Sequence, residues 1–110
     1  MQTALQVICT GGPSLRTLIA HYGRKLEPFG LELVAEKHPR RNPGWMKVRG
    51  AEPGIWGALN ISWDTDTRTL TGRVVNKRYG TPHKMIGRFV DFLLHRHSRR
   101  IKVISIFRVD

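Results

Sequence analysis

The chain has 110 residues, enough for one modest hydrophobic core, so we expect a single domain over residues 1–110. Hydrophobic residues make up 40% and charged residues 25%, which argues against an intrinsically disordered chain. Nineteen Lys and Arg residues against eight Asp and Glu residues give a net charge of +11, of which +10 lies in residues 38–110. Charge of this density points to a polyanionic partner.

The first part of the chain predicts a strand, a helix and a second strand. Residues 4–9 alternate with period two, and residues 31–37 do so again. Between them, apolar residues recur at helical spacing over residues 15–26, and we expect Pro13 to be the first helical residue. Two prolines and a glycine make residues 38–44 a loop.

The rest of the chain predicts a run of strands, a second helix and a last strand. The segment 80–100 predicts a helix with Thr81 as its cap and Pro82 as its first residue. The last segment, 101–109, is apolar on both faces at its centre, which is typical of a central strand. The other expected strands are 45–50, 55–63 and 69–75.

The element order β-α-β-β-β-β-α-β predicts an α+β two-layer sandwich. In this prediction two helices cover a mixed, mostly antiparallel sheet, because the four middle strands form a meander. A ferredoxin-like variant is the arrangement that we expect. The whole chain is then one basic α+β domain.

The turn Thr-Gly-Gly-Pro-Ser at residues 10–14 lies between a strand and a helix, where many proteins bind phosphate. It lacks the lysine of a Walker A loop and the third glycine of a dinucleotide fingerprint. Arg16 also lies one position too late for the loop of a cysteine phosphatase. We therefore expect a tight turn with Cys9 buried as a small apolar residue, and at most one backbone phosphate contact near Ser14.

The sequence offers no combination of side chains that defends a catalytic site. A lone cysteine excludes a cysteine-based zinc site, and His95 and His97 lie on different faces of their helix. We expect no catalytic activity, no metal and no cofactor. The alternative is a metal-dependent nuclease that uses Asp64 and Asp66, since hard cations prefer carboxylate oxygens.

Basic residues form four groups in the second part of the chain, and aromatic residues lie among them. Lys and Arg contacts to phosphate give affinity, while exposed aromatic rings stack on unpaired bases. The tryptophans could equally be packed side chains. The residues that we expect to bind nucleic acid are Arg40, Arg41, Trp45, Lys47, Arg49, Trp56, Arg73, Lys77, Arg78, Tyr79, Lys84, Arg88, Arg96, Arg99, Arg100 and Lys102.

These observations predict a small basic protein that binds DNA or RNA through phosphate contacts. If both helices cover one side of the sheet, the other side is polar and basic, with an apolar part at Ile8, Ile104 and Ile106 that a second copy would cover. A homodimeric module that binds an acidic protein is therefore another alternative. The sequence has no membrane span and no secretory signal, so we expect a cytoplasmic location.

Overall fold

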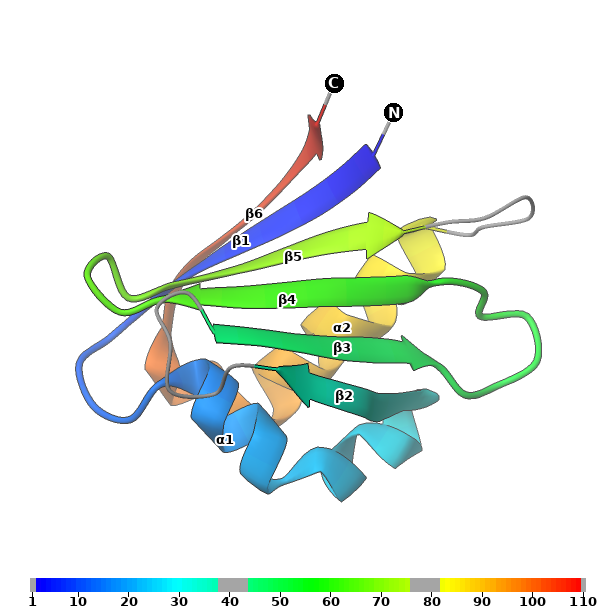
Figure 1. Cartoon of the computed structure of the whole chain (residues 1–110), viewed down its shortest axis with the longest axis horizontal. Coiled ribbons are helices and arrows are strands. Elements are labelled where there is room, and N and C mark those ends of the chain that lie inside the picture. The colour runs from blue at the N-terminus through cyan, green and yellow to red at the C-terminus, as the bar shows by residue number, and fades with distance from the viewer. Residues whose placement is uncertain (1, 38–43, 76–81, 110) are drawn as a thin grey trace.

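The computed structural model describes residues 2–37, 44–75 and 82–109, and for residues 35–37, 44 and 45 it describes the backbone only. One sheet has the strand order β2-β3-β4-β5-β1-β6, and each described pairing is antiparallel (Figure 1). The strands are β1 (Gln2–Cys9), β2 (Leu31–Lys37), β3 (Gly44–Gly50), β4 (Ala58–Asp64), β5 (Thr69–Val75) and β6 (Ile101–Val109).

The sheet has an inner, apolar face and an outer, mostly polar face, because successive side chains of a strand point to opposite sides. The inner face packs against the helices and forms one core with their apolar side chains. Its fully buried members include Leu5, Val7, Val48, Leu59, Ile61 and Leu70 from the strands and Leu15, Ile19, Phe89, Phe92 and Leu93 from the helices.

Helix α1 (Leu15–His21) begins two residues later than we predicted. Ser14 is its N-cap, since the Ser14 hydroxyl accepts a hydrogen bond from the Thr17 N–H at 3.2 Å. The prediction that Pro13 is the first helical residue is therefore wrong. The α-helix predicted over residues 15–26 ends at His21, and the chain then forms the 3-10 segment η1 (Gly23–Phe29).

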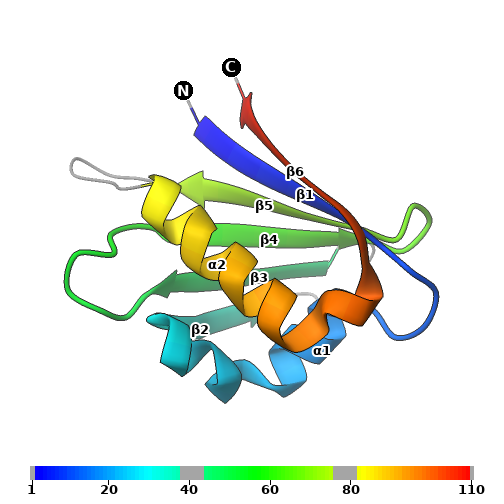
Figure 2. The ribbon, with the colours of Figure 1, turned by 180° about the vertical axis from the view of Figure 1, so that it is seen from behind.

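Helix α2 (Pro82–His97) begins at Pro82, as predicted, and lies across the inner face of the sheet (Figure 2). The predicted cap Thr81 lies outside the described residues. A 3-10 turn, η2 (Ser98–Arg100), joins α2 to β6. The prediction of two helices is incomplete, because η1 and η2 add two short 3-10 segments.

The protein is an α+β fold in which helices cover one face of an antiparallel sheet. The parallel pairs of the predicted mixed sheet do not occur among the described strands. Strands β5 and β6, joined by α2, lie on either side of β1. A ferredoxin-like arrangement goes further than these observations and stays a prediction. Among the described helices, none has the length and apolar character needed to cross a membrane.

Three strand predictions need correction. Strand β4 begins at Ala58 rather than at residue 55, because Gly54 and Gly57 turn the backbone with φ angles of 88° and 111°. Strand β6 lies at the sheet edge and not at its centre. Ile104 and Ile106 lie on the inner face, since they pair with the inner residues Val7 and Leu5.

Candidate nucleic-acid interface

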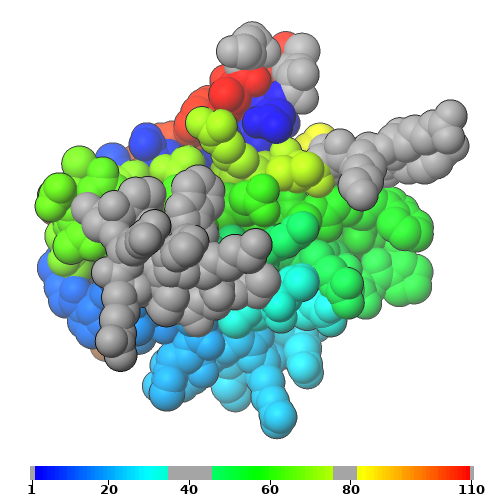
Figure 3. Space-filling view, in the orientation of Figure 1, coloured from blue at the N-terminus to red at the C-terminus, as the bar shows by residue number. Residues whose placement is uncertain are grey.

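The outer face of the sheet carries a row of side chains that crosses five strands. Lys47 of β3 lies opposite Asn60 of β4, which lies opposite Arg73 of β5. The row continues through Ala4 of β1 to Phe107 of β6. These five residues are called the outer row, and Figure 3 views the molecule from this side. Because neighbouring strands lie about 4.8 Å apart, the backbones at Lys47 and Arg73 are about 10 Å apart.

The outer row combines two cations with an aromatic ring. Lys47 and Arg73 are exposed, Asn60 between them is half-buried, and Phe107 is 40% exposed. A neighbouring row offers neutral groups that donate and accept hydrogen bonds, namely Ser62, Thr71, Gln6 and Ser105. The face therefore has cations for phosphate, polar groups for sugar or base edges, and a ring for stacking.

The acidic side chains of the outer face lie at its margins and are already engaged. Glu32 of β2 forms an ion pair with Arg49 of β3. Asp64 accepts hydrogen bonds through Oδ1 from the N–H groups of Asp66 at 2.9 Å and Thr67 at 3.4 Å. Within the described part of the chain, neither Lys47 nor Arg73 forms an ion pair. Their charge is thus available to a ligand, whereas that of Arg49 is largely neutralised.

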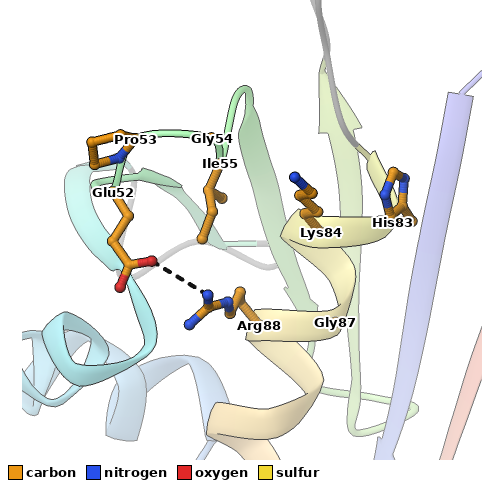
Figure 4. Close-up of a pocket in the computed structure, with 8 residues that line it drawn as sticks. All are labelled: Glu52, Pro53, Gly54, Ile55, His83, Lys84, Gly87 and Arg88. Carbon is orange, nitrogen blue, oxygen red and sulfur yellow. Dashed lines mark ion pairs between the residues drawn. The ribbon is translucent and has the colours of Figure 1, made fainter.

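The loop between β3 and β4 meets the start of α2 in an open cavity of about 350 Å³ (Figure 4). Glu52 Oε2 and Arg88 Nη2 form an ion pair across it at 3.3 Å, and Lys84 lies one helical turn before Arg88. Trp56 lies in this loop and is 58% exposed. The prediction that Trp56 belongs to a strand is wrong, because Trp56 precedes β4.

The predicted basic residues do not form one surface. Arg96, Arg99 and Lys102 are exposed near the end of α2, and Arg100 beside them is half-buried. Because a helix rises about 1.5 Å per residue, Arg96 lies about 12 Å along α2 from Arg88 and about 18 Å from Lys84. The structure thus separates a group at the end of α2 from Lys84 and Arg88, and both from the outer row.

The turn at residues 10–14, called the glycine turn below, accepts hydrogen bonds from two arginine side chains. The Arg68 guanidinium donates to the carbonyl oxygens of Thr10 at 3.0 Å and Gly12 at 2.5 Å, and Arg100 donates to that of Pro13 at 3.0 Å. In return, the N–H of Cys9 donates to the Arg68 carbonyl at 3.0 Å and that of Thr10 to the Arg100 carbonyl at 2.9 Å. The turn therefore directs carbonyl oxygens to these cations. This supports the prediction of a tight structural turn rather than a phosphate site.

The Cys9 thiol lies beneath this turn and is buried. Burial raises the pKa of Cys9 above its usual value, although the charges of Arg68 and Arg100 pull it down. A thiol is a nucleophile only as the thiolate. Cys9 is accordingly a small apolar residue of the core and has no role at the candidate interface.

The described residues give no support to a metal site at Asp64 and Asp66. The Asp64 carboxylate caps the β4–β5 turn through its bonds to Asp66 and Thr67. No group of three His, Cys, Asp or Glu side chains is placed to hold a metal ion within residues 2–37, 44–75 and 82–109. The nuclease alternative therefore has no observation in its favour.

Several residues predicted to bind nucleic acid lie outside the described part of the chain, and the prediction omitted one residue of the outer row, Phe107. Arg40, Arg41, Lys77, Arg78 and Tyr79, and the side chain of Trp45, lie outside the described residues. Phe107 was not predicted, because residues 101–109 resemble a buried central strand. Period-two alternation from Val103 and Ser105 would have placed it on the outer face.

No protein-family model, curated protein or solved structure matches this chain. The functional interpretation therefore depends on the geometry of the outer face and on its charge.

Proposed function

We propose that this protein binds single-stranded DNA or RNA, without catalysis, across the outer face of its sheet. The observation that carries the proposal is the outer row, in which Lys47 and Arg73 stand exposed on either side of Asn60 and in line with Phe107. Lys47 and Arg73 bind phosphates, Asn60 contributes hydrogen bonds, and the Phe107 ring stacks on a base.

The preference for unpaired nucleotides follows from the exposed ring of Phe107. Bases within a duplex are stacked on one another and cannot stack on Phe107, whereas unpaired bases can. A strand that crosses the sheet from β3 toward β6 meets the cations first and the ring last.

Fluorescence anisotropy with labelled oligonucleotides tests the proposal. We expect the protein to bind a single strand more tightly than a duplex of the same length, with affinity that falls steeply as salt rises. The double variant Lys47→Ala/Arg73→Ala binds more weakly. Its charge-matched control is Arg24→Ala/Lys25→Ala, which removes the same charge from η1, away from the outer face.

Two results would overturn the proposal. One is the absence of binding at low salt. The other is an equal loss of affinity in the two double variants, since binding would then depend on net charge and not on the outer row.

An acidic protein partner would use the same cations as a nucleic acid. Competition between such a protein and an oligonucleotide would therefore not distinguish the two partners, whereas a stronger affinity for single strands than for duplexes does. The cytoplasmic location stays a prediction.

A further inference from the structure

Strand β6 has the composition of a central strand but lies at the edge of the sheet. It pairs with β1 on one side, and no described strand lies on its other side (Figures 1 and 2). Its apolar side chains point to both faces and remain exposed, with Val103 at 46%, Ile106 at 57% and Phe107 at 40%. An edge of this kind presents unpaired backbone groups and apolar side chains to another strand.

The opposite edge strand, β2, has features that protect an edge against pairing with another strand. Strand β2 has a register shift between Leu33 and Ala35 that interrupts regular pairing, and it carries Glu32 near its start. Bulges and charged side chains are the usual means by which edge strands avoid association. Strand β6 has neither device between Val103 and Phe107, the segment that would carry the contact.

An apolar groove runs beside β6 on the inner face. Thr3, Ile86, Val90 and Ile106 are among the residues that line a cavity of about 390 Å³ between the start of α2 and the strands β1 and β6. Leu94 lies one turn after Val90 on the same side of α2 and is 52% exposed. The apolar surface therefore continues from the edge strand onto the helix layer.

We infer that β6 pairs with β6 of a second copy of this chain, antiparallel and centred on Ser105, so that the two sheets become one. The sequence Val103-Ile104-Ser105-Ile106-Phe107 is close to symmetric about its middle residue. In this register Val103 lies opposite Phe107 of the second copy on the outer face, and Ile104 lies opposite Ile106 on the inner face. Side chains opposite each other in an antiparallel pair contact directly.

The charges favour a second copy over an acidic strand from another protein. No cation lies between Lys102 and Arg108, so an acidic strand would place its carboxylates against apolar side chains. A second copy instead brings apolar side chains to apolar side chains, and its own α2 brings Leu94 toward the groove. The cost is that Lys102 meets Arg108 of the second copy at each end, a repulsion between exposed charges that salt screens.

This inference shares Phe107 with the proposed function but does not depend on it, and salt separates the two. Nucleic-acid binding weakens as salt rises, whereas pairing through apolar side chains against like charges persists or strengthens. Dimerisation is therefore measured at high salt and without nucleic acid. Loss of oligonucleotide binding would leave the inference about β6 unaffected, and a monomeric protein would leave the outer row unaffected.

Light scattering coupled to size exclusion tests the pairing through the mass in solution. We expect a mass of twice 12.6 kDa for the wild-type protein at micromolar concentration. Val103→Lys raises the dissociation constant by at least about tenfold, because a lysine then replaces the apolar contact with Phe107 of the second copy, and a charge on an edge strand opposes pairing. The control Val34→Lys changes the same residue type, at the same 46% exposure, on the β2 edge and leaves the dimer intact. A wild-type monomer at all concentrations, or equal effects of the two variants, would overturn the inference.

A cross-link tests the register even if Val103→Lys does not fold. Ser105 is exposed, and two cysteines opposite each other in an antiparallel pair have a separation that a disulfide spans. Ser105→Cys therefore forms a covalent dimer on mild oxidation. Arg108→Cys does not, because its symmetry mate lies six residues away along the partner strand, and wild-type Cys9 is buried. Cross-linking at residue 108 but not at 105 would contradict the register.

Discussion

The glycine turn and the outer row contain the same kind of residue in two different roles. At the turn, Arg68 and Arg100 direct their guanidinium groups to the carbonyl oxygens of Thr10, Gly12 and Pro13. In the outer row, Lys47 and Arg73 stand exposed, without an ion pair among the described residues. The first pair stabilises the chain and the second is available to a ligand. A count of positive charges along the sequence cannot tell these roles apart.

The largest expected effect is on stability, at Arg68. Arg68→Ala removes two hydrogen bonds from a charged donor and the contact of the guanidinium with the Trp63 ring, 5.9 Å from its centroid. We expect a loss of about 3 kcal/mol in the free energy of unfolding, measured by urea denaturation. Arg73→Ala, from the outer row, should change it by less than about 0.5 kcal/mol. Similar losses in both variants would remove the distinction between the two regions.

Gly12→Ala tests the second arginine of the glycine turn, Arg100. Gly12 has a φ of 118°, and a Cβ there would overlap the guanidinium of Arg100. We expect a loss of about 2 kcal/mol in stability, from backbone strain and displacement of Arg100. The control is Gly11→Ala, because a Cβ at Gly11 meets no atom within 4 Å. If the clash matters, the effect of Gly12→Ala shrinks in an Arg100→Ala background, and full additivity would contradict it.

Phe107→Leu tests the stacking role of the outer row. Leucine keeps the apolar volume at the edge of the sheet but lacks a ring, so the variant should lose about 1 kcal/mol of affinity for a single strand. Affinity for a duplex should not change. Anisotropy with both oligonucleotides measures the difference, and equal losses for the two would assign Phe107 a structural role.

The smallest expected effect is a pH dependence of stability from His97, at the end of α2. Burial lowers the pKa of His97 below its usual 6.5, and the charges of Arg96 and Arg100 lower it further. As pH falls through 6.5, the unfolded chain therefore takes up this proton before the folded one does, and the free energy of unfolding decreases. Urea denaturation across this range should show the decrease, and His97→Gln should reduce it. The exposed His95→Gln is the control, and an unchanged profile in His97→Gln would contradict the assignment.

Local sequence patterns predicted much of the backbone but not the position of each strand. Residues 31–37 and 69–75 form the strands that period-two alternation predicted, and α2 begins at Pro82. Pro13 was misplaced because the Ser14 hydroxyl, one residue later, caps the helix. Residues 101–109 are apolar on both faces of β6 although the strand lies at the sheet edge, so the local pattern resembled that of a central strand.

The candidate site was predictable only in part for the same reason. Alternation placed Lys47, Arg49 and Arg73 on one face, and the register confirms this. That Arg49 is paired with Glu32 and that Arg100 is engaged by the glycine turn depends on contacts between residues distant in sequence. Such contacts arise from the strand order, which no local pattern encodes.

The most direct test of the proposed function is the salt dependence of oligonucleotide binding in the two charge-matched double variants. Each phosphate contact contributes about 0.7 to the slope of log K against log salt concentration for a single strand. We predict that Lys47→Ala/Arg73→Ala lowers the slope by about 1.4 and that Arg24→Ala/Lys25→Ala leaves it unchanged. An unchanged slope in the outer-row variant, together with wild-type stability, would contradict the role of Lys47 and Arg73 as the phosphate contacts.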